Sequence, residues 1–313
     1  MAATLLLAGT LRAEAPLSFL DGDLNLMPIA GLFALEPAPA QPGNHWRVDL
    51  RTASLAARRS RGNEFMLFDG ETSRLSLHWQ HQLSDRLSIA ADLPYVWHTR
   101  GVLDPFIDSW HKTFGLPEGI RDDIPRDQLL FVYRDGDELF RLDRNTHGPG
   151  DVRLHTRYAM SANDRWSVTA TLKLPTGDVT RLTGSGALDV NGALHWRSDQ
   201  QPGSRWSFNA SLGGAYLGDA DINFRDQNSF IWTGHAAAGY AITERLMLGA
   251  RVQMHRGVIE SDIGALGDTA FLLVTGGSYR LSPTWQLNIT VDEDVRVRAS
   301  PDVTFRIGLQ RLR

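Results

Sequence analysis

The chain has 313 residues, a formal net charge of −4 and no cysteine. This length fits one large β domain or two ordinary domains. A sequence without cysteine has no disulfide, thiol nucleophile or cysteine metal site, and its slightly acidic balance gives no reason to expect nucleic acid as a partner. No run of about 18 apolar residues is present, so the sequence predicts no membrane-spanning helix.

The N-terminal residues have the character of a secretory signal. Residues 2–10 form an apolar run, and Ala13-Glu14-Ala15 matches a small-residue cleavage site, although the usual basic first region is missing. We therefore expect a signal peptide at 1–15. Residues 16–44 are rich in proline, glycine and alanine with apolar islands, and they predict either a plug or a periplasmic tail.

Alternating apolar and polar side chains predict about twelve long strands. In segment 205–216, for example, Trp206, Phe208 and Leu212 fall on one face and small or polar residues on the other. Ten or fourteen strands are alternatives, because segment 62–69 is ambiguous. The predicted strands are 45–57, 71–82, 86–98, 151–160, 165–175, 186–197, 205–216, 229–241, 245–256, 269–280, 284–293 and 301–312.

A repeated turn indicates how these strands are connected. A short run of polar turn residues precedes each of four positions that are spaced by 40, 40 and 39 residues, namely Trp166, Trp206, Leu246 and Trp285. That period fits a strand, a long loop, a second strand and a short turn, which is the unit of an up-and-down transmembrane barrel. A soluble β sandwich also alternates, but its strands are usually shorter. We predict an all-β, antiparallel transmembrane barrel at 45–313, with both mature termini at the periplasmic mouth.

The apolar face of the predicted strands should meet lipid, and aromatic residues should mark its two edges. Trp166, Trp206 and Trp285 follow short turns, and Tyr95 and Trp97 lie at the opposite strand ends, so together they predict an interfacial girdle. The residues expected to face lipid are Leu87, Ile89, Leu93, Trp166, Val168, Leu172, Phe208, Leu248, Leu287, Ile289, Phe305 and Ile307.

The insertion at 98–150 is far longer than the other outer loops. Within it, Asp104-Pro105 can begin a short helix, and Asp135-Gly136 between apolar residues predicts a tight hairpin. We expect a lid over the mouth or an inward-folded plug; the alternative is an apolar knob that packs on the outer strand ends. The predicted lid residues are Phe106, Ile107, Trp110, His111, Phe114, Gly115 and Pro117.

The polar face of the strands should line the interior. Basic residues outnumber acidic ones there, which favours a conduit biased toward anions or anionic amphiphiles. The alternative is an interior filled by arginine–aspartate pairs, because buried charges persist when they are partnered. The lumen candidates are Arg47, Arg51, Arg74, His78, Asp92, Arg153, His155, Arg157, Lys173, His195, Arg251 and Arg306.

An outer-membrane lipid hydrolase is the rival functional class. Ser76 and His78 share one strand face, as a nucleophile and its base would. Such a pair arises easily by chance, and no carboxamide partner or surrounding motif accompanies it. The histidines show no metal-binding spacing. We therefore predict no catalytic residues, metal or cofactor.

Several motifs in sequence order are similar to those of one family. They are DLNLMPIAGLF, GVLDPFIDSWHKTFGLPEGIRDD, GPGDVRLHTRY, LKLPTGD and LTGSGALDV. The chain resembles the proteobacterial outer-membrane proteins called domain of unknown function 3187, and two of the elements also resemble wider barrels that occur near aromatic-compound degradation operons. The resemblance spans essentially the whole mature chain. It implies an outer-membrane barrel but no particular activity.

The functional prediction is an outer-membrane channel or transporter of a Gram-negative bacterium, gated by the 98–150 insertion. Its expected solutes are small or amphipathic, anionic ones among them. A structural or surface-recognition barrel with a closed lumen is the alternative. Expected partners are outer-membrane lipid, the barrel-assembly machinery during insertion and an unidentified small solute, with no nucleic acid. The sequence names no solute.

Overall fold

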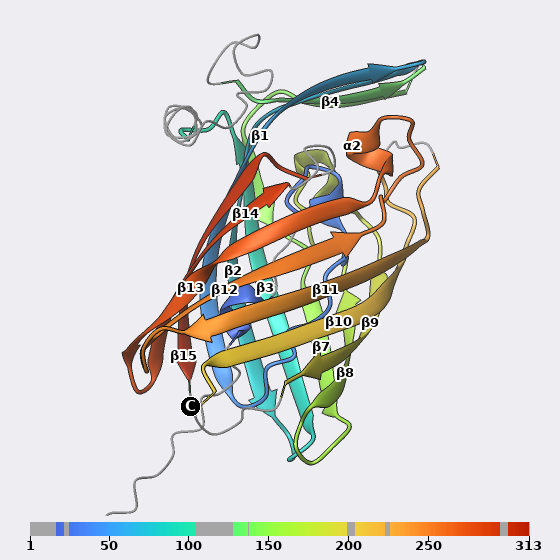
Figure 1. Cartoon of the computed structure of the whole chain (residues 1–313). Coiled ribbons are helices and arrows are strands. Elements are labelled where there is room, and N and C mark those ends of the chain that lie inside the picture. The colour runs from blue at the N-terminus through green and yellow to red at the C-terminus, as the bar shows by residue number, and fades with distance from the viewer. Residues whose placement is uncertain are drawn as a thin grey trace, which may run out of the picture.

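A computed structural model describes residues 17–21, 25–103, 128–136, 138–198, 204–222, 226–294 and 300–312. In this part of the chain, 12 strands close into one antiparallel barrel and 3 further strands lie outside the ring. Figure 1 shows the strands running obliquely around the barrel, with short turns at the bottom and longer loops at the top. The predicted fold class is confirmed.

Ring strands that follow one another around the barrel are antiparallel neighbours, and β15 pairs with β1 to close the ring. Each of the twelve predicted strands has its counterpart. The ring consists of β1 (His45–Arg61), β2 (Glu64–Gln82), β3 (Leu87–Thr99), β7 (Arg153–Ala159), β8 (Trp166–Lys173), β9 (Asp189–Arg197), β10 (Trp206–Leu217), β11 (Phe230–Ala241), β12 (Leu246–His255), β13 (Ala270–Ser282), β14 (Trp285–Asp294) and β15 (Val303–Leu312).

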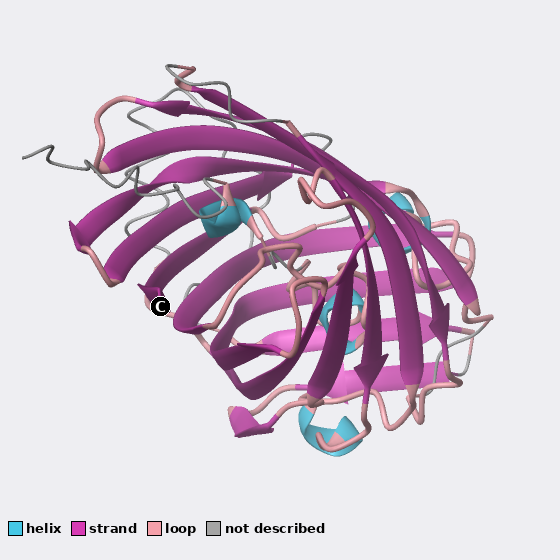
Figure 2. Cartoon of the chain, turned by 90° about the horizontal axis from the view of Figure 1, so that it is seen from below, coloured by secondary structure: helices cyan, strands magenta, loops and turns pink. Residues whose placement is uncertain are grey.

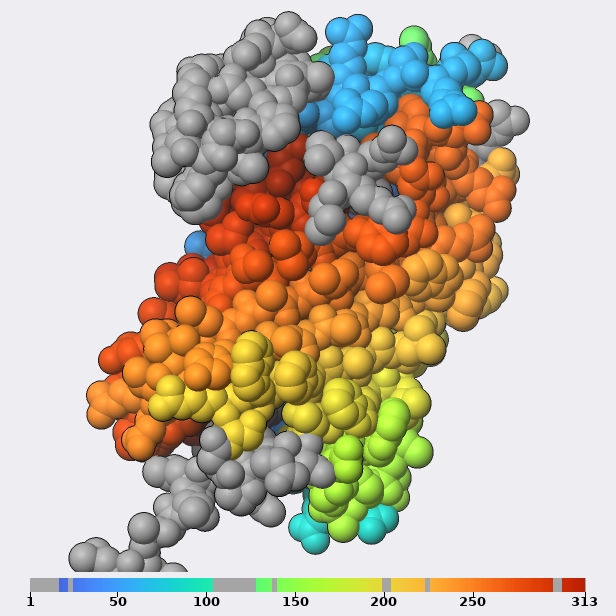
Figure 3. All heavy atoms as spheres, in the orientation of Figure 1, coloured from blue at the N-terminus to red at the C-terminus, as the bar shows by residue number. Residues whose placement is uncertain are grey.

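Strand parity sets the two faces of the wall, because successive side chains of a strand point to opposite sides. Ile289 on β14 is 50 % exposed, whereas the next residue, Thr290, is fully buried. The twelve residues that were predicted to face outward are all exposed or half-buried. On the side that Figure 3 shows, the side chains of β10 to β14, yellow to red, form one continuous outer surface.

The β1–β2 hairpin continues beyond the ring, which the sequence did not predict. The first strand was expected to end at residue 57 and the second to begin at residue 71, but the pairing runs on to Arg61 and Glu64. The segment 57–65 lacks alternation because it is outside the barrel wall, so parity could not reveal it. We call residues 55–69 the flap.

Three outer strands extend the sheet from the flap and from β3. β4 (Leu130–Asp135) pairs with β2 in the flap and with β5 (Glu138–Leu142), and β6 (Thr146–Pro149) pairs with β3. The β4–β5 pairing confirms the hairpin predicted at Asp135-Gly136. In Figure 1 the upper part of β1 and β4 lie above the barrel. The predicted lid helix at 104–117 lies outside the described residues, as does the predicted signal peptide.

The N-terminal residues run inside the barrel. We call residues 17–21 and 25–44 the inner segment. Leu17 packs beside Ala237 and Met247 near the short-turn end, Asn25 contacts His255 at 3.0 Å, and Asn44 returns to the turn end, where its side chain accepts a hydrogen bond from the Gln82 amide at 2.7 Å. Figure 2, a view from below, shows loops and helical turns inside the ring of strands.

Helical structure is sparse in the described ranges. It comprises η1 (Ser18–Leu20) and η2 (Ala30–Leu32) in the inner segment, η4 (Val179–Arg181) in the β8–β9 loop and α2 (Gly264–Gly267) in the β12–β13 loop. None of these helices has the length and apolarity to cross a bilayer. The fold therefore consists of a wall of strands, an inner segment and a covered upper end.

Candidate functional site

The predicted lumen residues lie on the inner face of the wall. Eleven of them are buried, and the side chain of Asp92 is 19 % exposed. They do not surround an empty bore, because the inner segment contacts them. The structure therefore brings the predicted set together around a polypeptide rather than around open solvent.

Arginines of the wall donate hydrogen bonds to backbone carbonyls of the inner segment. Arg153 donates to Phe33 at 3.0 Å, and Arg157 donates to Ala40 at 2.8 Å. Arg306 donates to Phe19 at 2.8 Å and to Asp21 at 3.2 Å. Each of these three buried guanidinium groups thus donates to at least one backbone carbonyl of the inner segment.

The composition of the inner segment explains this contact. Pro37, Pro39 and Pro42 have no backbone N–H, so residues 36–44 present more carbonyl acceptors than amide donors. A wall rich in guanidinium groups is the complementary surface, because arginine only donates. The sequence shows the proline-rich segment and the arginines of the strands. Which of them meet depends on contacts between residues more than 100 positions apart.

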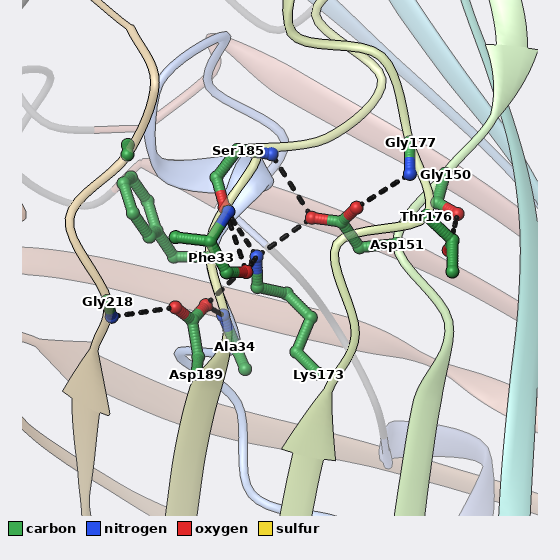
Figure 4. Close-up of polar contacts among 12 residues, drawn as sticks. Phe33, Ala34, Gly150, Asp151, Lys173, Thr176, Gly177, Ser185, Asp189 and Gly218 are labelled. Carbon is green, nitrogen blue, oxygen red and sulfur yellow. Dashed lines mark hydrogen bonds and ion pairs between the residues drawn. The ribbon is translucent and has the colours of Figure 1, made fainter.

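The family motifs build a buried ionic site around Lys173, which Figure 4 shows. The Lys173 ammonium is fully buried and lies 2.8 Å from Asp151 and 3.3 Å from Asp189. It also donates to Ser185 Oγ at 2.5 Å and to the Ala187 carbonyl at 2.9 Å. Lysine at such a position needs these partners, because burying an unpaired charge is costly.

The same site holds the inner segment. Asp189 accepts a hydrogen bond from the Ala34 amide at 2.9 Å, and Asn191 donates to the Ala34 carbonyl at 3.0 Å. The Lys173 ammonium lies 5.9 Å from the centre of the Phe33 ring. Asp151 and Ser185 belong to the GPGD and TGSG motifs, which gave the resemblance, but the sequence assigned them no role.

Glycines of these motifs allow the loops to approach closely. A side chain at Gly177 would lie 2.6 Å from the Thr183 carbonyl, and Gly186 has a φ of +77°. The Gly177 amide donates to Asp151 at 2.8 Å. The glycines of LPTGD and TGSG thus let backbone amides reach the carboxylate that also holds Lys173.

An apolar cluster covers the upper end of the barrel. It joins the inner segment, the flap, β4 and the β12–β13 loop, so side chains far apart in the sequence meet above the polar interior. Its members include Ile29, Phe33, Leu55, Met66, Phe68, Phe131, Leu182, Ile231, Ile259 and Leu266. From the 98–150 insertion, this cover contains Leu129, Phe131, Tyr133 and Leu142.

Glu64 fastens the flap to its neighbours. Its carboxylate accepts hydrogen bonds from the Tyr133 hydroxyl at 2.8 Å and from the Asp262 and Ile263 amides at 2.8 and 3.2 Å. Ser261 Oγ donates to it at 3.1 Å. Burial and the contact with Glu64 raise the pKa of the Tyr133 phenol, which keeps it protonated as a donor. The sequence gave no signal for this role.

A cavity of about 700 Å³ lies toward the short-turn end, between the inner segment and the wall. Asp164 in its lining is shared by Arg157 and Arg197, the latter at 2.8 Å. Its other polar lining groups include Arg165, His195, His235 and Arg251. Guanidinium and imidazole groups therefore outnumber carboxylates around this space.

The serine and histidine of the hydrolase alternative do not contact each other. Ser76 Oγ accepts a hydrogen bond from Arg74 at 3.1 Å, and His78 Nδ1 contacts Asp92 at 2.7 Å. His78 Nε2, the atom that would take a proton, has no hydrogen-bond partner in the part of the chain that the structure describes. Both side chains are buried, so this arrangement does not present a nucleophile to a substrate. The described residues contain no group suited to hold a metal ion.

The aromatic residues of the predicted girdle lie on the outside. Trp166 and Trp206 are 44 % and 53 % exposed. The rings of Trp285 and Trp46 meet edge to face, with their centroids 5.2 Å apart. On β3, Tyr95 hydrogen-bonds to His147 at 2.6 Å and Trp97 is half-buried. Their placement at the strand ends on the outer face fits the predicted edges of an apolar belt.

Three solved structures illustrate what the fold is similar to. A COG4313 outer membrane channel from Pseudomonas putida F1 is 14 % identical with a TM-score of 0.55, over 87 % of this chain and 95 % of that one. The KdgM porin is 10 % identical with a TM-score of 0.45, over 85 % and 98 %. The Ralstonia pickettii toluene transporter TbuX is 10 % identical with a TM-score of 0.42, over 95 % and 93 %.

The likeness to the first of these structures concerns the fold alone. Comparison with curated protein sequences gives no match. The sequence profile of the proteins of unknown function DUF3187 matches residues 35–311. This range contains the loops around Lys173 and every ring strand except the last residue of β15, and the chain therefore belongs to the DUF3187 family.

Proposed function

We propose that the protein is an outer-membrane channel or transporter of a Gram-negative bacterium for small or amphipathic solutes, with a preference for anions. In this proposal the inner segment closes the path through the barrel, and the 98–150 insertion controls access from outside. The observation that carries the proposal is the polar contact between inner segment and wall, with a cavity of about 700 Å³ beside it.

A membrane location is supported by the outer face of the barrel. Large apolar side chains such as Leu93, Leu212 and Ile307 are 52 %, 69 % and 50 % exposed. A belt of this kind around a closed barrel is unfavourable in water and suits the hydrocarbon layer of a bilayer. The fold also leaves no ring edge unpaired, as a strand structure in lipid requires.

Arginine at Ile289 should destabilise the membrane-inserted barrel by about 2–4 kcal/mol, because this outward position lies in the middle of a strand. Ile289 is 50 % exposed and β14 spans Trp285–Asp294. Leu281→Arg is the matched control, since Leu281 is also 50 % exposed but lies at the turn end of β13, where the cost should be about 0–1 kcal/mol. Denaturant unfolding in lipid vesicles measures both; equal costs would contradict a lipid-facing belt.

A channel role is supported by the way the inner segment is held. Wall arginines bind its carbonyls, and carbonyl contacts can be exchanged for water or for an incoming solute at modest net cost. The excess of guanidinium groups around the cavity favours anions. The name of the first compared protein, an outer membrane channel, is compatible with this class of function.

Tethering the inner segment to the wall should abolish conduction. Gln310 Nε2 of β15 donates a hydrogen bond to Gln41 Oε1 of the segment at 2.9 Å. The chain has no natural cysteine. We expect the variant Gln41→Cys/Gln310→Cys, joined by a short bifunctional thiosulfonate reagent, to show no openings in planar-bilayer recordings. Reduction of the linker should restore them, and deletion of 25–41 should raise the open probability further.

Each single-cysteine variant treated with the same reagent is the control, since it carries the modification without the tether. Deletion of 103–143 tests the insertion separately and should increase conduction if it restricts access. A barrel that conducts in none of these states would overturn the channel proposal.

A closed structural or recognition barrel is the second candidate. The apolar cluster at the upper end favours it, because the inner segment, the flap and β4 bury large side chains such as Phe33, Phe68 and Phe131 in one core. If the barrel remains closed after both deletions, this cover is a permanent part of the fold and function resides in the outer surface.

A further inference from the structure

A small chamber of about 30 Å³ lies between the wall and the inner segment, separate from the larger cavity. Its lining combines wall residues with Glu36, Pro37 and Pro39 of the segment. The wall contributes Arg47, Asp49, Arg51, Arg74, Ser76, Asp92, Arg153 and His155. Four arginines and three acidic residues therefore line one space.

The three carboxylates already have partners outside the chamber or beside it. Asp49 pairs with Arg47 at 2.5 Å and with Arg306 at 3.0 Å. Asp92 contacts His78 and His155, each at 2.7 Å. Glu36 accepts a hydrogen bond from Gln253 and lies 3.6 Å from Arg251.

Two buried guanidinium groups lack such a partner. Arg74 donates to Ser76 Oγ at 3.1 Å, and Arg153 donates to the Phe33 carbonyl at 3.0 Å. Within the described part of the chain, neither forms an ion pair, although they are only 5 % exposed. Among the described residues, Arg153 Nε also has no hydrogen-bond partner. Buried cations in this state are unfavourable.

The strand register adds to this excess of positive charge. Arg51 on β1 lies directly opposite Arg306 on β15 and directly opposite Arg74 on β2. Like charges at directly opposed positions repel. Arg74 therefore has a second guanidinium group opposite it in the sheet, beside the chamber.

We propose that the chamber binds one small inorganic monovalent anion, chloride being the example, between Arg74 and Arg153. The space exceeds what one water-sized particle requires, and one small anion there can accept hydrogen bonds from both guanidinium groups, which only donate. Because Pro37 and Pro39 form part of the chamber, the anion bridges wall and inner segment. Binding of the anion and docking of the segment then stabilise each other.

Bromide locates the site in the full-length protein. Crystals grown in sodium bromide should show anomalous scattering from bromine within hydrogen-bonding distance of Arg74 and Arg153. An occupied chamber supports the proposal, and a chamber without bromine signal overturns it. This result does not depend on conduction, so the channel proposal can fail while the anion site holds.

Thermal unfolding in detergent gives a second readout. The unfolding temperature of the wild type should rise saturably with chloride and not with gluconate at equal ionic strength, because gluconate is too large for the chamber. Arg74→Gln should lose the chloride-specific rise. Arg59→Gln should keep it, since Arg59 is exposed on the flap.

Arg153→Gln repeats the test if the first variant does not fold, and the wild-type comparison stands without either variant. Equal responses of the wild type to chloride and gluconate would refute the proposal. So would an unchanged chloride response in both chamber variants.

Discussion

Lys173→Met is expected to destabilise the barrel by about 3–5 kcal/mol, the usual cost of removing one partner from a buried ion pair. The ammonium is fully buried and lies 2.8 Å from Asp151 and 3.3 Å from Asp189, which are 4 % and 0 % exposed. Methionine fills a similar volume but leaves two buried carboxylates without their shared cation. Denaturant unfolding of the refolded barrel measures the loss.

Arg181→Met is the matched control in the same loop region. Arg181 and Asp178 lie 3.3 Å apart with side chains 54 % and 44 % exposed, and an exposed ion pair contributes only about 0–1 kcal/mol. If both methionine variants lose the same small amount, the Lys173 cluster does not hold the fold as its burial indicates.

The Lys173 variant also bears on the inner segment. Asp189 binds the Ala34 amide, and the ammonium lies over the Phe33 ring. A disturbed cluster should therefore increase the rate at which protease cuts residues 25–44, while Arg181→Met should leave that rate unchanged.

The ring strands were predictable because each is long enough to show a period of two. A closed barrel separates an apolar outside from a polar inside, so Ile289 and Thr290 differ in both chemistry and burial. The same parity placed Arg74, Arg153 and Lys173 inside. Local alternation was sufficient for these residues, since the wall imposes it at every strand.

The contents of the barrel were not predictable in the same way. The segment from Glu36 to Asn44 shows no regular alternation of apolar and polar residues. Its composition is compatible with both predicted alternatives, a plug and a periplasmic tail. Its placement depends on contacts such as that of Arg157 with Ala40, 117 residues apart. Pairings of this kind are set by the closed fold.

The cover of the upper end escaped prediction for another reason. The flap carries Arg58, Arg59 and Arg61 on an exposed tip, so its sequence resembles a solvated loop more than a strand. Its order comes from pairing with β4 and from the contacts of Glu64, both of which involve distant residues.

Glu64→Ala should release the flap from the β12–β13 loop. The substitution leaves the Asp262 and Ile263 amides without their acceptor. A hydrogen bond to a charged group contributes about 1.5–3 kcal/mol, which corresponds to about ten- to hundredfold faster amide exchange. Hydrogen exchange read by mass spectrometry on a peptide that covers 256–269 measures this change.

Two variants separate the carboxylate from its neighbours. Tyr133→Phe removes only the hydroxyl donor, so Glu64 keeps its bonds to the two amides and exchange there should change little. Glu64→Gln retains one acceptor oxygen and should fall between the wild type and Glu64→Ala. If alanine leaves amide exchange at 262 and 263 unchanged, the apolar cluster alone holds the flap, and the upper end of the barrel is closed by packing rather than by a polar latch.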